Sequence, residues 1–455
     1  MNWFENLVNI INGIMWNKNL LVILLVVSGI IFTIRTRGVQ FRLFAHMCQL
    51  LTEKSKAGKD EVSSFQAFCI STASRVGVGN LAGVVAAVSV GGPGSVFWMW
   101  VVALLNSSTA FIESTIAILY REKDPKGGYR GGAPYFLTKG LNQRWLGILF
   151  VIFALICWGG VFQVISNSVT ESFNTAFGIN TSMTSLILVI LSAGVLFGNR
   201  NKIVKVLDKM VPFMAALYLI VVFYIIVKNI GLMGTTMVDI FEHAFGVKQF
   251  LGGTFGSVVM EGVKRGLFSN EAGSGSAPCA AAAAEVEHPA KQGLIQALGV
   301  LVDTVVICSA TAFVILLSKG HVQEGLGGMT LLQEAFRYHV GEWGVVFTAV
   351  ILFLFSFSTI LGISFYAKPN LYFLCEKEWP QEAFKIFTLI MLYWGGVRQN
   401  FLVWSLADLG LGLMTIVNMI GVFPLVSKAL ESLKEYEVKF FNRLCHNKWL
   451  IFDEK

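Results

Sequence analysis

The chain has 455 residues, of which 55% are hydrophobic and 14% charged, and its mean hydropathy is +0.66. A soluble globular protein carries about 25% charged residues, so this composition excludes a soluble enzyme or binding domain and indicates an integral membrane protein. The formal net charge of +7 does not indicate a nucleic-acid partner, because the basic residues gather in the loops between apolar segments.

Eleven apolar segments are long enough, or nearly so, to span a hydrocarbon core, which takes about 20 helical residues. They do not alternate between apolar and polar residues as the strands of a membrane barrel do. We therefore expect an all-α integral membrane protein. The predicted spans are 19–34, 64–90, 95–120, 145–172, 182–198, 209–228, 250–284, 291–317, 343–374, 382–397 and 401–427.

Lysine and arginine are distributed unevenly over the loops that join these spans. With the N-terminus outside, the predicted cytoplasmic loops and tail hold 26 of these residues and the outer loops hold six. Cytoplasmic loops of membrane proteins are enriched in basic residues. The sequence therefore predicts a multi-pass protein of the cell inner (plasma) membrane, with its C-terminus in the cytoplasm.

The order of the segments predicts the domain organisation. Residues 1–18 lack the basic region of a signal peptide and are expected to lie at the outer interface. An extra first helix and a cytoplasmic loop follow at 19–63. Glycine interrupts the second and the seventh span, which lie five spans apart, so we expect two inverted five-helix repeats at 64–228 and 250–427. A short charged cytoplasmic tail is predicted at 428–455.

The second span contains the sequence STASRVGVGNLAG at 71–83. Backbone groups freed by a broken helix are tolerated in a bilayer only where they line a cavity or bind a ligand. The N–H groups at Gly77, Gly79 and Gly83 suit a carboxylate. Close helix packing through small residues is the alternative interpretation, and the spacing of the glycines does not match a nucleotide-binding loop.

The seventh span contains GLFSNEAGSGSAP at 266–278, which places several hydrogen-bonding side chains in an apolar segment. Glu271 is the only carboxylate among them. It could bind a cation, carry a proton, or pair with Arg75, Lys264 or Arg265. The same alternatives apply to the buried Glu113 and Asp303.

The remaining residues show no motif typical of an enzyme. The seven cysteines and six histidines have no metal-binding spacing, and no nucleophile motif is present. We therefore expect no enzymatic activity, no cofactor and no obligatory protein partner. A passive channel, which needs a continuous polar path, is the less favoured alternative to a transporter.

Four strings resemble the alanine or glycine:cation symporter family, over about residues 60 to 430. They are GVGNLAGV at 77–84, GGPGSVFWMW at 91–100, GLFSNEAGSGSAP at 266–278 and FSFSTILG at 355–362. The resemblance implies the inverted-repeat fold shared with the bacterial leucine transporter. It also implies sodium as the coupling ion and small neutral amino acids, such as alanine and glycine, as substrates.

The resemblance also implies a substrate site. Val78 stands where many members have threonine, so a hydroxyl contact to the substrate is lost while the backbone contact can remain. Ile363 stands where a pocket tryptophan is expected, so the pocket is predicted to admit a larger substrate such as glutamine. Gln163 could instead bond a neighbouring helix, and Phe268 could be core packing. The implied substrate residues are Val78, Gly79, Gln163, Phe268, Ser269, Asn270, Gly273 and Ile363.

The ion site implied by the resemblance lies between the first break and the ninth span. Adjacent serine and threonine also bond their own helix backbone, which is the alternative interpretation of this pair. The mechanism we expect is sodium-coupled uptake by alternating access, with a proton carried by Glu271 as the alternative. The implied sodium ligands are backbone oxygens of Ala73, Val76 and Phe355 and the hydroxyls of Ser358 and Thr359.

Overall fold

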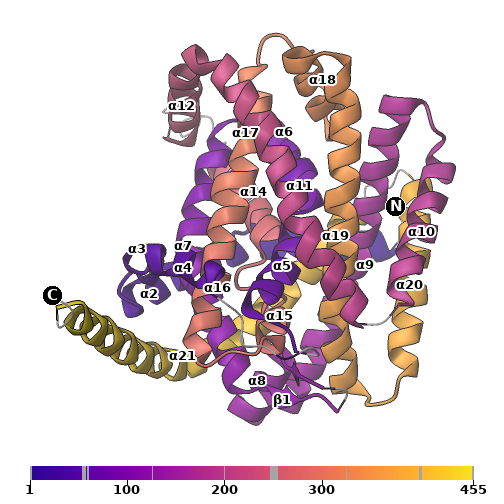
Figure 1. Cartoon of the computed structure of the whole chain (residues 1–455). Helices are drawn as coiled ribbons and strands as arrows, with labels where there is room; N and C mark the ends of the chain where they lie inside the picture. The colour runs from indigo at the N-terminus through magenta and orange to yellow at the C-terminus, as the bar shows by residue number, and fades with distance from the viewer. Residues whose placement is uncertain are drawn as a thin grey trace.

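A computed structural model describes residues 3–53, 58, 61–125, 127–198, 200–245, 255–323, 325–398 and 402–452. Within these ranges the fold is a bundle of long helices, several of which stand roughly side by side in Figure 1. A hairpin of two short antiparallel strands, β1 (Glu122–Lys123) and β2 (Tyr129–Arg130), joins two of the helices. The structure therefore confirms the predicted all-α fold.

The first half of the chain forms helices up to residue 245. Two of its segments, marked η, are π-helices. The bounds are α1 Trp3–Asn12, η1 Gly13–Asn17, α2 Leu20–Arg35, α3 Val39–Arg42, α4 Phe44–Thr52, α5 Ser64–Arg75, η2 Gly79–Gly83, α6 Val84–Gly91, α7 Gly94–Leu119, α8 Ala133–Leu141, α9 Arg144–Phe177, α10 Thr181–Leu196, α11 Arg200–Lys228 and α12 Ile230–Phe245.

The second half resumes at residue 255 and contains one further π-helix. The bounds are α14 Phe255–Asn270, α15 Pro278–Ala283, α16 Pro289–Leu301, η3 Val302–Cys308, α17 Ser309–Leu317, α18 Gly328–Val340, α19 Glu342–Leu374, α20 Trp379–Val397 and α21 Leu402–Phe452. The predicted second repeat begins at residue 250, and residues 250–254 lie outside the described part of the chain.

Helices lie in all eleven predicted spans. Seven described helices are long and apolar enough to cross a membrane, or eight if the pair Ser64–Arg75 and Gly79–Gly91, bent by 49°, forms one span. The three others, α10, α14 with α15, and α20, are shorter or carry more polar residues. In α14 these are Glu261, Lys264 and Arg265. The count of eleven spans therefore stays a prediction.

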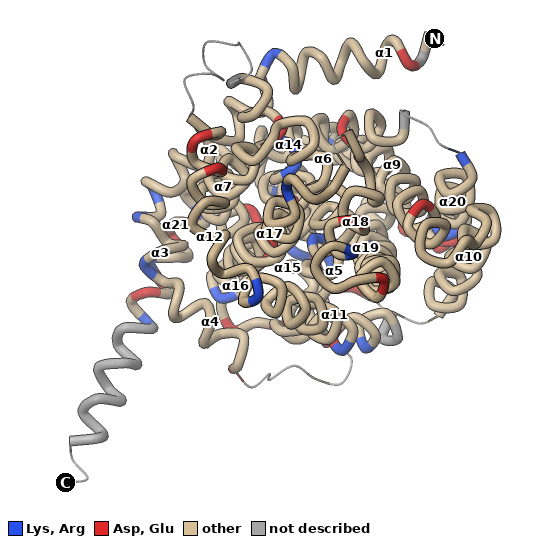
Figure 2. Tube along the Cα trace, turned by 90° about the horizontal axis from the view of Figure 1, so that it is seen from above, with Lys and Arg blue, Asp and Glu red and all other residues tan. Residues whose placement is uncertain are grey.

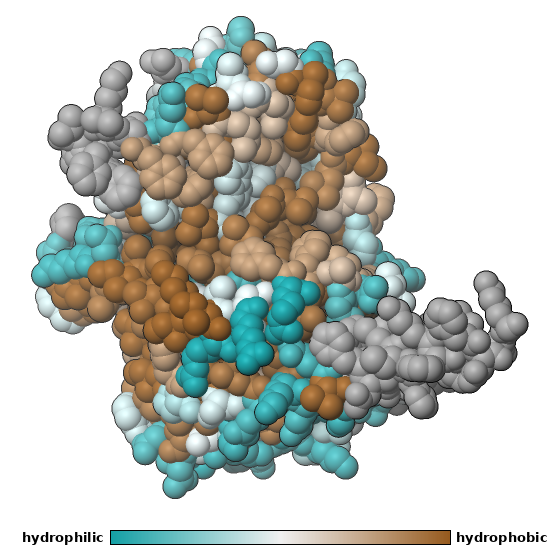
Figure 3. Space-filling view, turned by 90° about the vertical axis from the view of Figure 1, so that its left-hand side faces the viewer, coloured by the Kyte–Doolittle hydropathy of each residue, from teal (hydrophilic) through white to brown (hydrophobic). Residues whose placement is uncertain are grey.

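The surface matches a membrane environment. Figure 3 shows apolar side chains over much of the middle of one face, with hydrophilic side chains gathered toward both ends. Large apolar residues such as Ile190, Ile220 and Phe223 are exposed. In Figure 2 most of the trace is uncharged. Such a surface suits a hydrocarbon solvent, as expected of a multi-pass protein.

Local sequence explains where the broken spans begin and end. The Ser63 hydroxyl accepts a hydrogen bond from Gln66 N, and the Gln66 side chain accepts one from Ser63 N, both at 3.1 Å. This capping box starts α5. Pro278 at the first turn starts α15, because proline has no N–H to lose there.

The ends of the chain differ in part from the predicted segments. Helix α1 lies along one edge of the molecule in Figure 2, and Asn19, with φ 59°, separates η1 from α2. At the other end, α21 continues unbroken past residue 428. Its residues from 428 onward are good helix formers with Lys428 and Glu431 3.3 Å apart. The domain boundaries stay predictions.

Candidate functional site

The two glycine-interrupted segments lie against each other. A Cβ atom on Gly79 would lie 3.2 Å from the Cα atom of Ser269 and 3.3 Å from the carbonyl oxygen of Phe268. Glycine therefore lets the backbone of the first break approach the end of α14 closely. In the second break, Gly273 and Gly275 have φ angles of 91° and 83°, which only glycine adopts readily.

A small internal cavity lies between the breaks. Its volume is about 30 Å³, enough for about two water molecules. The walls combine residues from α5, α9, the two breaks, α19 and α21. The lining residues are Ser74, Arg75, Val78, Gly79, Cys157, Trp158, Val161, Phe268, Glu271, Ser276, Thr359, Ile363 and Leu411.

Five of the predicted site residues meet at this cavity. Val78 and Gly79 contribute the first break, Phe268 the end of α14, and Thr359 and Ile363 the middle of α19. The wall formed by these residues is mostly apolar on the side of Phe268 and Ile363. The first break contributes backbone groups close to it. This combination of backbone polar groups and an apolar wall is complementary to a solute with one charged end and a neutral side chain.

Ser269 and Asn270 are buried beside the cavity in a polar network. The Asp303 carboxylate, at the start of η3, accepts hydrogen bonds from Asn80 Nδ2 at 2.7 Å and from the Ser269 hydroxyl at 2.6 Å. Thr304 donates to the same carboxylate at 2.9 Å and accepts from Asn270 Nδ2 at 3.2 Å. The network therefore joins both breaks to η3.

A second buried carboxylate holds the unwound backbone at Gly273. Glu113 Oε1 accepts from Gly273 N at 3.1 Å, and its Oε2 accepts from Asn418 Nδ2 at 2.8 Å. Asn418 Nδ2 also donates to the Gly273 carbonyl at 2.8 Å. Helices α7 and α21 thus satisfy backbone groups that the broken helix leaves unpaired. Glu113 accordingly has a structural role here.

Four of the five predicted ion ligands come together between α5 and α19. The Ser358 and Thr359 hydroxyls lie 3.3 and 3.2 Å from the Ala73 carbonyl oxygen. They lie 2.8 and 2.9 Å from the Phe355 carbonyl oxygen. The fifth, Val76, is buried at the end of α5, where its N–H donates to the Thr72 carbonyl at 2.6 Å. The result is a compact group of neutral oxygens.

An aromatic and ionic layer borders the cavity at Phe268. The Phe268 ring packs against Trp404 in a tilted arrangement at a centroid distance of 5.2 Å, and the Arg265 guanidinium lies 4.6 Å from the same indole. Asp408 bonds Lys264 at 2.6 Å and lies 3.7 Å from Arg265. These ion pairs show that Lys264 and Arg265 are partners of α21 and not of Glu271.

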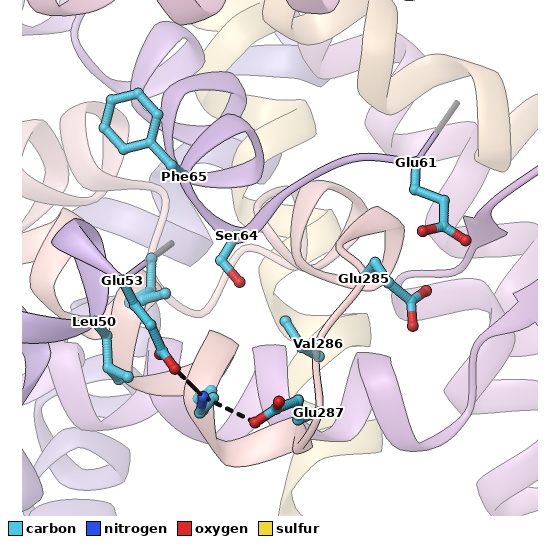
Figure 4. Close-up of a pocket in the computed structure, with 10 residues that line it drawn as sticks. Leu50, Glu53, Glu61, Ser64, Phe65, Glu285, Val286 and Glu287 are labelled. Carbon is cyan, nitrogen blue, oxygen red and sulfur yellow. Dashed lines mark hydrogen bonds and ion pairs between the residues drawn. The ribbon is translucent and has the colours of Figure 1, made fainter. Parts of the chain in front are cut away.

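The start of α5 and the end of α15 are joined to each other. Residues Val62 and Ala284 form a parallel bridge, with Glu285 N donating to the Val62 carbonyl at 2.8 Å. Beside this bridge lies a pocket of about 250 Å³. Figure 4 shows it lined by Glu61, Glu285 and other acidic side chains, with dashed lines joining Lys291 to Glu53 and Glu287.

Gln163 is a predicted substrate residue that does not line this cavity. It packs at the contact of α9 with α20, where its Nε2 donates to the Gly159 carbonyl at 3.3 Å. A Cβ atom on Gly395 of α20 would lie 2.4 Å from Gln163 Cα. The role of Gln163 as a substrate residue therefore stays a prediction.

Several cavity residues were not identified from the sequence. Trp158 and Val161 lie on the cavity face of α9, and Leu411 faces it from α21. Gly159 and Gly160 after Trp158 were an available signal, because Gly160 lies against Ala407 of α21.

Among the described residues, no group of three or more His, Cys, Asp and Glu could hold a metal ion.

Comparison with known proteins identifies what the chain resembles. Residues 1–446 match the model of the Sodium:alanine symporter family. The "Probable sodium/glutamine symporter GlnT" of Bacillus subtilis (strain 168) is 44% identical over 95% of this chain and 90% of the relative. The "Amino-acid carrier protein AlsT" of the same organism is 40% identical over 96% and 92%.

A solved structure supports the fold. The chain resembles the crystal structure of the Eremococcus coleocola manganese transporter, with a TM-score of 0.51 and 12% identity. The match covers 81% of this chain and 78% of that one. At this identity the likeness concerns the fold alone, which is that of the leucine-transporter-like membrane proteins.

Proposed function

The chain belongs to the sodium:alanine symporter family, and from this we propose that it carries neutral amino acids into the cell in symport with sodium. The family consists of transporters, which argues against an enzyme. The candidate substrates are alanine, glycine and glutamine. Alternating access about the two breaks is the proposed mechanism.

The cavity between the breaks supports the substrate class. Backbone groups of Val78 and Gly79 at one wall suit a carboxylate, and the side-chain wall of Ile363, Trp158 and Leu411 is apolar. The cavity is small in this conformation, so an amino acid enters only after the walls move apart. Two observations favour glutamine as a substrate. Ile363 leaves more space than the tryptophan expected at this position, and the relative that is 44% identical is named a probable sodium/glutamine symporter.

The oxygen group between α5 and α19 supports sodium as the coupling ion. The hydroxyls of Ser358 and Thr359 each lie within 3.3 Å of both Ala73 O and Phe355 O. Neutral oxygens at such spacing are ligands that a hard cation prefers. An ion there would fix α5 against α19 and thereby fix the first break, to which Gly77 belongs.

The arrangement of ion and substrate predicts mutual coupling. Whatever factor sodium adds to substrate affinity, the substrate adds to sodium affinity. The observation that carries the proposal is the meeting of five predicted site residues at one cavity, beside the oxygen group.

Uptake into proteoliposomes tests this function. Glycine, and alanine, glutamine and leucine as their L and D forms, are offered with a sodium gradient, a proton gradient, or no gradient. We expect accumulation only with sodium. Accumulation with the proton gradient alone would show that the coupling ion is a proton and not sodium. Equal fluxes with and without a gradient would show that the protein is a channel and not a symporter.

The ion site has its own test. The double variant Ser358→Ala with Thr359→Ala is expected to lose sodium-dependent uptake. Ser364→Ala, which removes a hydroxyl bonded only to its own helix at Ile360, is the matched control. Normal sodium dependence in the double variant would refute the ion site while leaving the family membership intact.

A further inference from the structure

One carboxylate at the central cavity is not used by the proposed cycle. Glu271 lies in the second break with a φ angle of 55°, a left-handed conformation that residues other than glycine rarely adopt. Such conformations persist where the surrounding structure determines them, and they cluster at functional sites. The position is therefore a candidate for a role beyond helix packing.

Only one oxygen of this carboxylate is bonded to the protein. Oε1 accepts a hydrogen bond from the Ser74 hydroxyl of α5 at 2.7 Å. Oε2 is buried and has no hydrogen-bond partner in the described part of the chain. A buried acceptor without a donor costs free energy, so a donor that enters the cavity would stabilise it.

The basic side chains near the breaks do not supply that donor. Lys264 forms an ion pair with Asp408, and Arg265 forms ion pairs with Glu261 and Asp408. Arg75 donates through Nη1 to the Gln296 carbonyl at 3.3 Å, on the side of α16. Within the described ranges no ion pair joins Glu271 to a lysine or arginine. Arg75 also lines the cavity but forms no ion pair with this carboxylate in the described part of the chain, so Oε2 is left to accept a hydrogen bond from a group that enters the cavity.

The other wall of the cavity has the opposite polarity. The backbone of Val78 and Gly79 lines it, at the start of η2, where the positive end of a helix favours an anion. A zwitterion needs one such wall for its carboxylate and a second wall for its ammonium group. Glu271, which lines the same cavity and accepts a hydrogen bond from Ser74, supplies the second one.

We propose that Glu271 Oε2 accepts a hydrogen bond from the ammonium group of the transported amino acid, an inference that rests on the proposed function. The substrate class follows from this contact. Amino acids with a free ammonium group are bound, and 2-hydroxy acids of the same size are rejected. A charge-assisted hydrogen bond is stronger than one to a neutral carbonyl, so this residue sets the preference.

Equilibrium binding separates this inference from transport. L-alanine and L-lactate, which differ in the ammonium group, are titrated calorimetrically into the purified full-length protein in sodium buffer. Wild type is expected to prefer alanine. In Glu271→Gln the alanine affinity should fall about 10- to 100-fold, the range for a lost hydrogen bond to a charged group. Lactate affinity should change little, so the ratio of alanine affinity to lactate affinity should fall by the same factor.

The control is Glu171→Gln, which neutralises another half-buried carboxylate, bonded to Thr330 at 3.2 Å on the far part of α9. It is expected to bind alanine as wild type does. Ser74→Ala removes the hydroxyl that orients Glu271, so it should lower the ratio of alanine affinity to lactate affinity by a smaller factor. This variant provides an independent test if Glu271→Gln is poorly folded.

Each outcome of these titrations either supports or overturns the assignment of Glu271. An unchanged alanine affinity in Glu271→Gln, or an equal loss for alanine and lactate, overturns the assignment. An unchanged preference in Ser74→Ala overturns it as well. Selective loss of alanine binding supports it even if wild-type proteoliposomes fail to accumulate alanine with sodium, a result that would refute only the proposed symport.

Discussion

At the scale of single residues, the side chain at position 363 decides the size of the cavity. Ile363 is buried, 1% exposed, and faces Trp158 and Phe268 across a volume of about 30 Å³. An interior this close-packed has no room for a larger group unless a neighbour moves. Substrate size should therefore respond strongly to this position.

Ile363→Trp is expected to separate small from large substrates. The indole fills space that a glutamine side chain needs, so glutamine uptake should fall at least about 10-fold, whereas alanine uptake should stay within about threefold, the kind of discrimination that side-chain volume gives. Competition of each amino acid against labelled alanine measures it. Ile363→Val is the matched control, and retained glutamine uptake in the Trp variant would contradict the assigned wall.

Gly77 is the residue that brings the first break against the oxygen group. A Cβ atom there would lie 2.0 Å from the Thr359 hydroxyl oxygen. Gly77→Ala should therefore displace Thr359 or the break, at a cost of about 1–3 kcal/mol, and sodium-dependent uptake should fall at least about 10-fold.

Gly234→Ala is the control for this substitution. Gly234 lies in α12 with nothing within 4 Å of a built Cβ atom, so alanine there should leave unfolding and uptake unchanged or raise stability by about 1 kcal/mol. Unfolding followed by intrinsic fluorescence, together with uptake at varied sodium, distinguishes the two variants. Wild-type uptake in Gly77→Ala would mean that the break tolerates a shift.

The residues also show what the sequence can and cannot predict. The breaks could be predicted because glycine and polar residues in apolar spans have few other uses. Trp158 could not, since a tryptophan in an apolar helix carries no sign of the face it occupies. Gln163 lies five residues later, about 140° around the helix, so it and Trp158 cannot both face the cavity.

At the scale of elements, the starts of α5, α10 and α16 carry side-chain caps that local sequence encodes. Contacts between elements are different: the bond from Ser74 to Glu271 joins residues 197 positions apart, and no local pattern contains it. The same holds for Asp303, whose partners in both breaks were not identified. Spans could be predicted from apolar length, but the continuation of α21 past residue 428 could not, because charged helices and charged tails have similar compositions.

The start of α16 is predicted to be sensitive to pH. His288 Nδ1 accepts the N-cap hydrogen bond from Ala290 N at 3.3 Å. Burial lowers the pKa of His288 below its usual value of 6.5, and Lys439 and Lys291 lower it further, against Glu435. The unfolded chain therefore takes up this proton first, and the stability that the neutral ring contributes is lost as the pH falls below about 6.5.

Thermal unfolding in detergent at pH 8 and at pH 5.5 measures this effect. The Tm of wild type should be lower at pH 5.5. His288→Asn, which keeps an N-cap acceptor but does not titrate, should lose part of that difference while keeping the Tm at pH 8 nearly unchanged. An identical pH difference in the variant would assign the sensitivity to other groups.

At the scale of the whole molecule, two different sets of contacts near the breaks are candidates for the two closures of an alternating-access cycle. Toward one end lie the bridge between residues 62 and 284 and the acidic pocket of Figure 4. Toward the other lie the packed rings of Phe268 and Trp404 and the ion pairs of Asp408. Alternating access requires that one of these closures opens while the other holds, so weakening either should bias the molecule toward one conformation.

Asp408 is the residue through which the ionic closure can be weakened. It is buried, 3% exposed, and joins α21 to Lys264 and Arg265 of α14. Removing one partner of a buried ion pair is strongly destabilising, by about 3–5 kcal/mol, and here that cost falls on the closed conformation. Asp408→Asn should therefore shift the population toward a conformation in which this end of the cavity is open.

Cys157 reports that opening, because its side chain lines the cavity and is only 4% exposed. In a background in which the other cysteines are replaced, alkylation of Cys157 by a small water-soluble reagent should be slow in wild type. In Asp408→Asn it should be faster by at least about 10-fold, the change that 1.4 kcal/mol produces.

Asp239→Asn is the control. It breaks an exposed pair with Lys319 and should leave the alkylation rate unchanged, since exposed pairs contribute little. Equal alkylation in wild type and Asp408→Asn would show that the aromatic stack alone closes this end, and that the ion pairs only position Phe268 and Trp404.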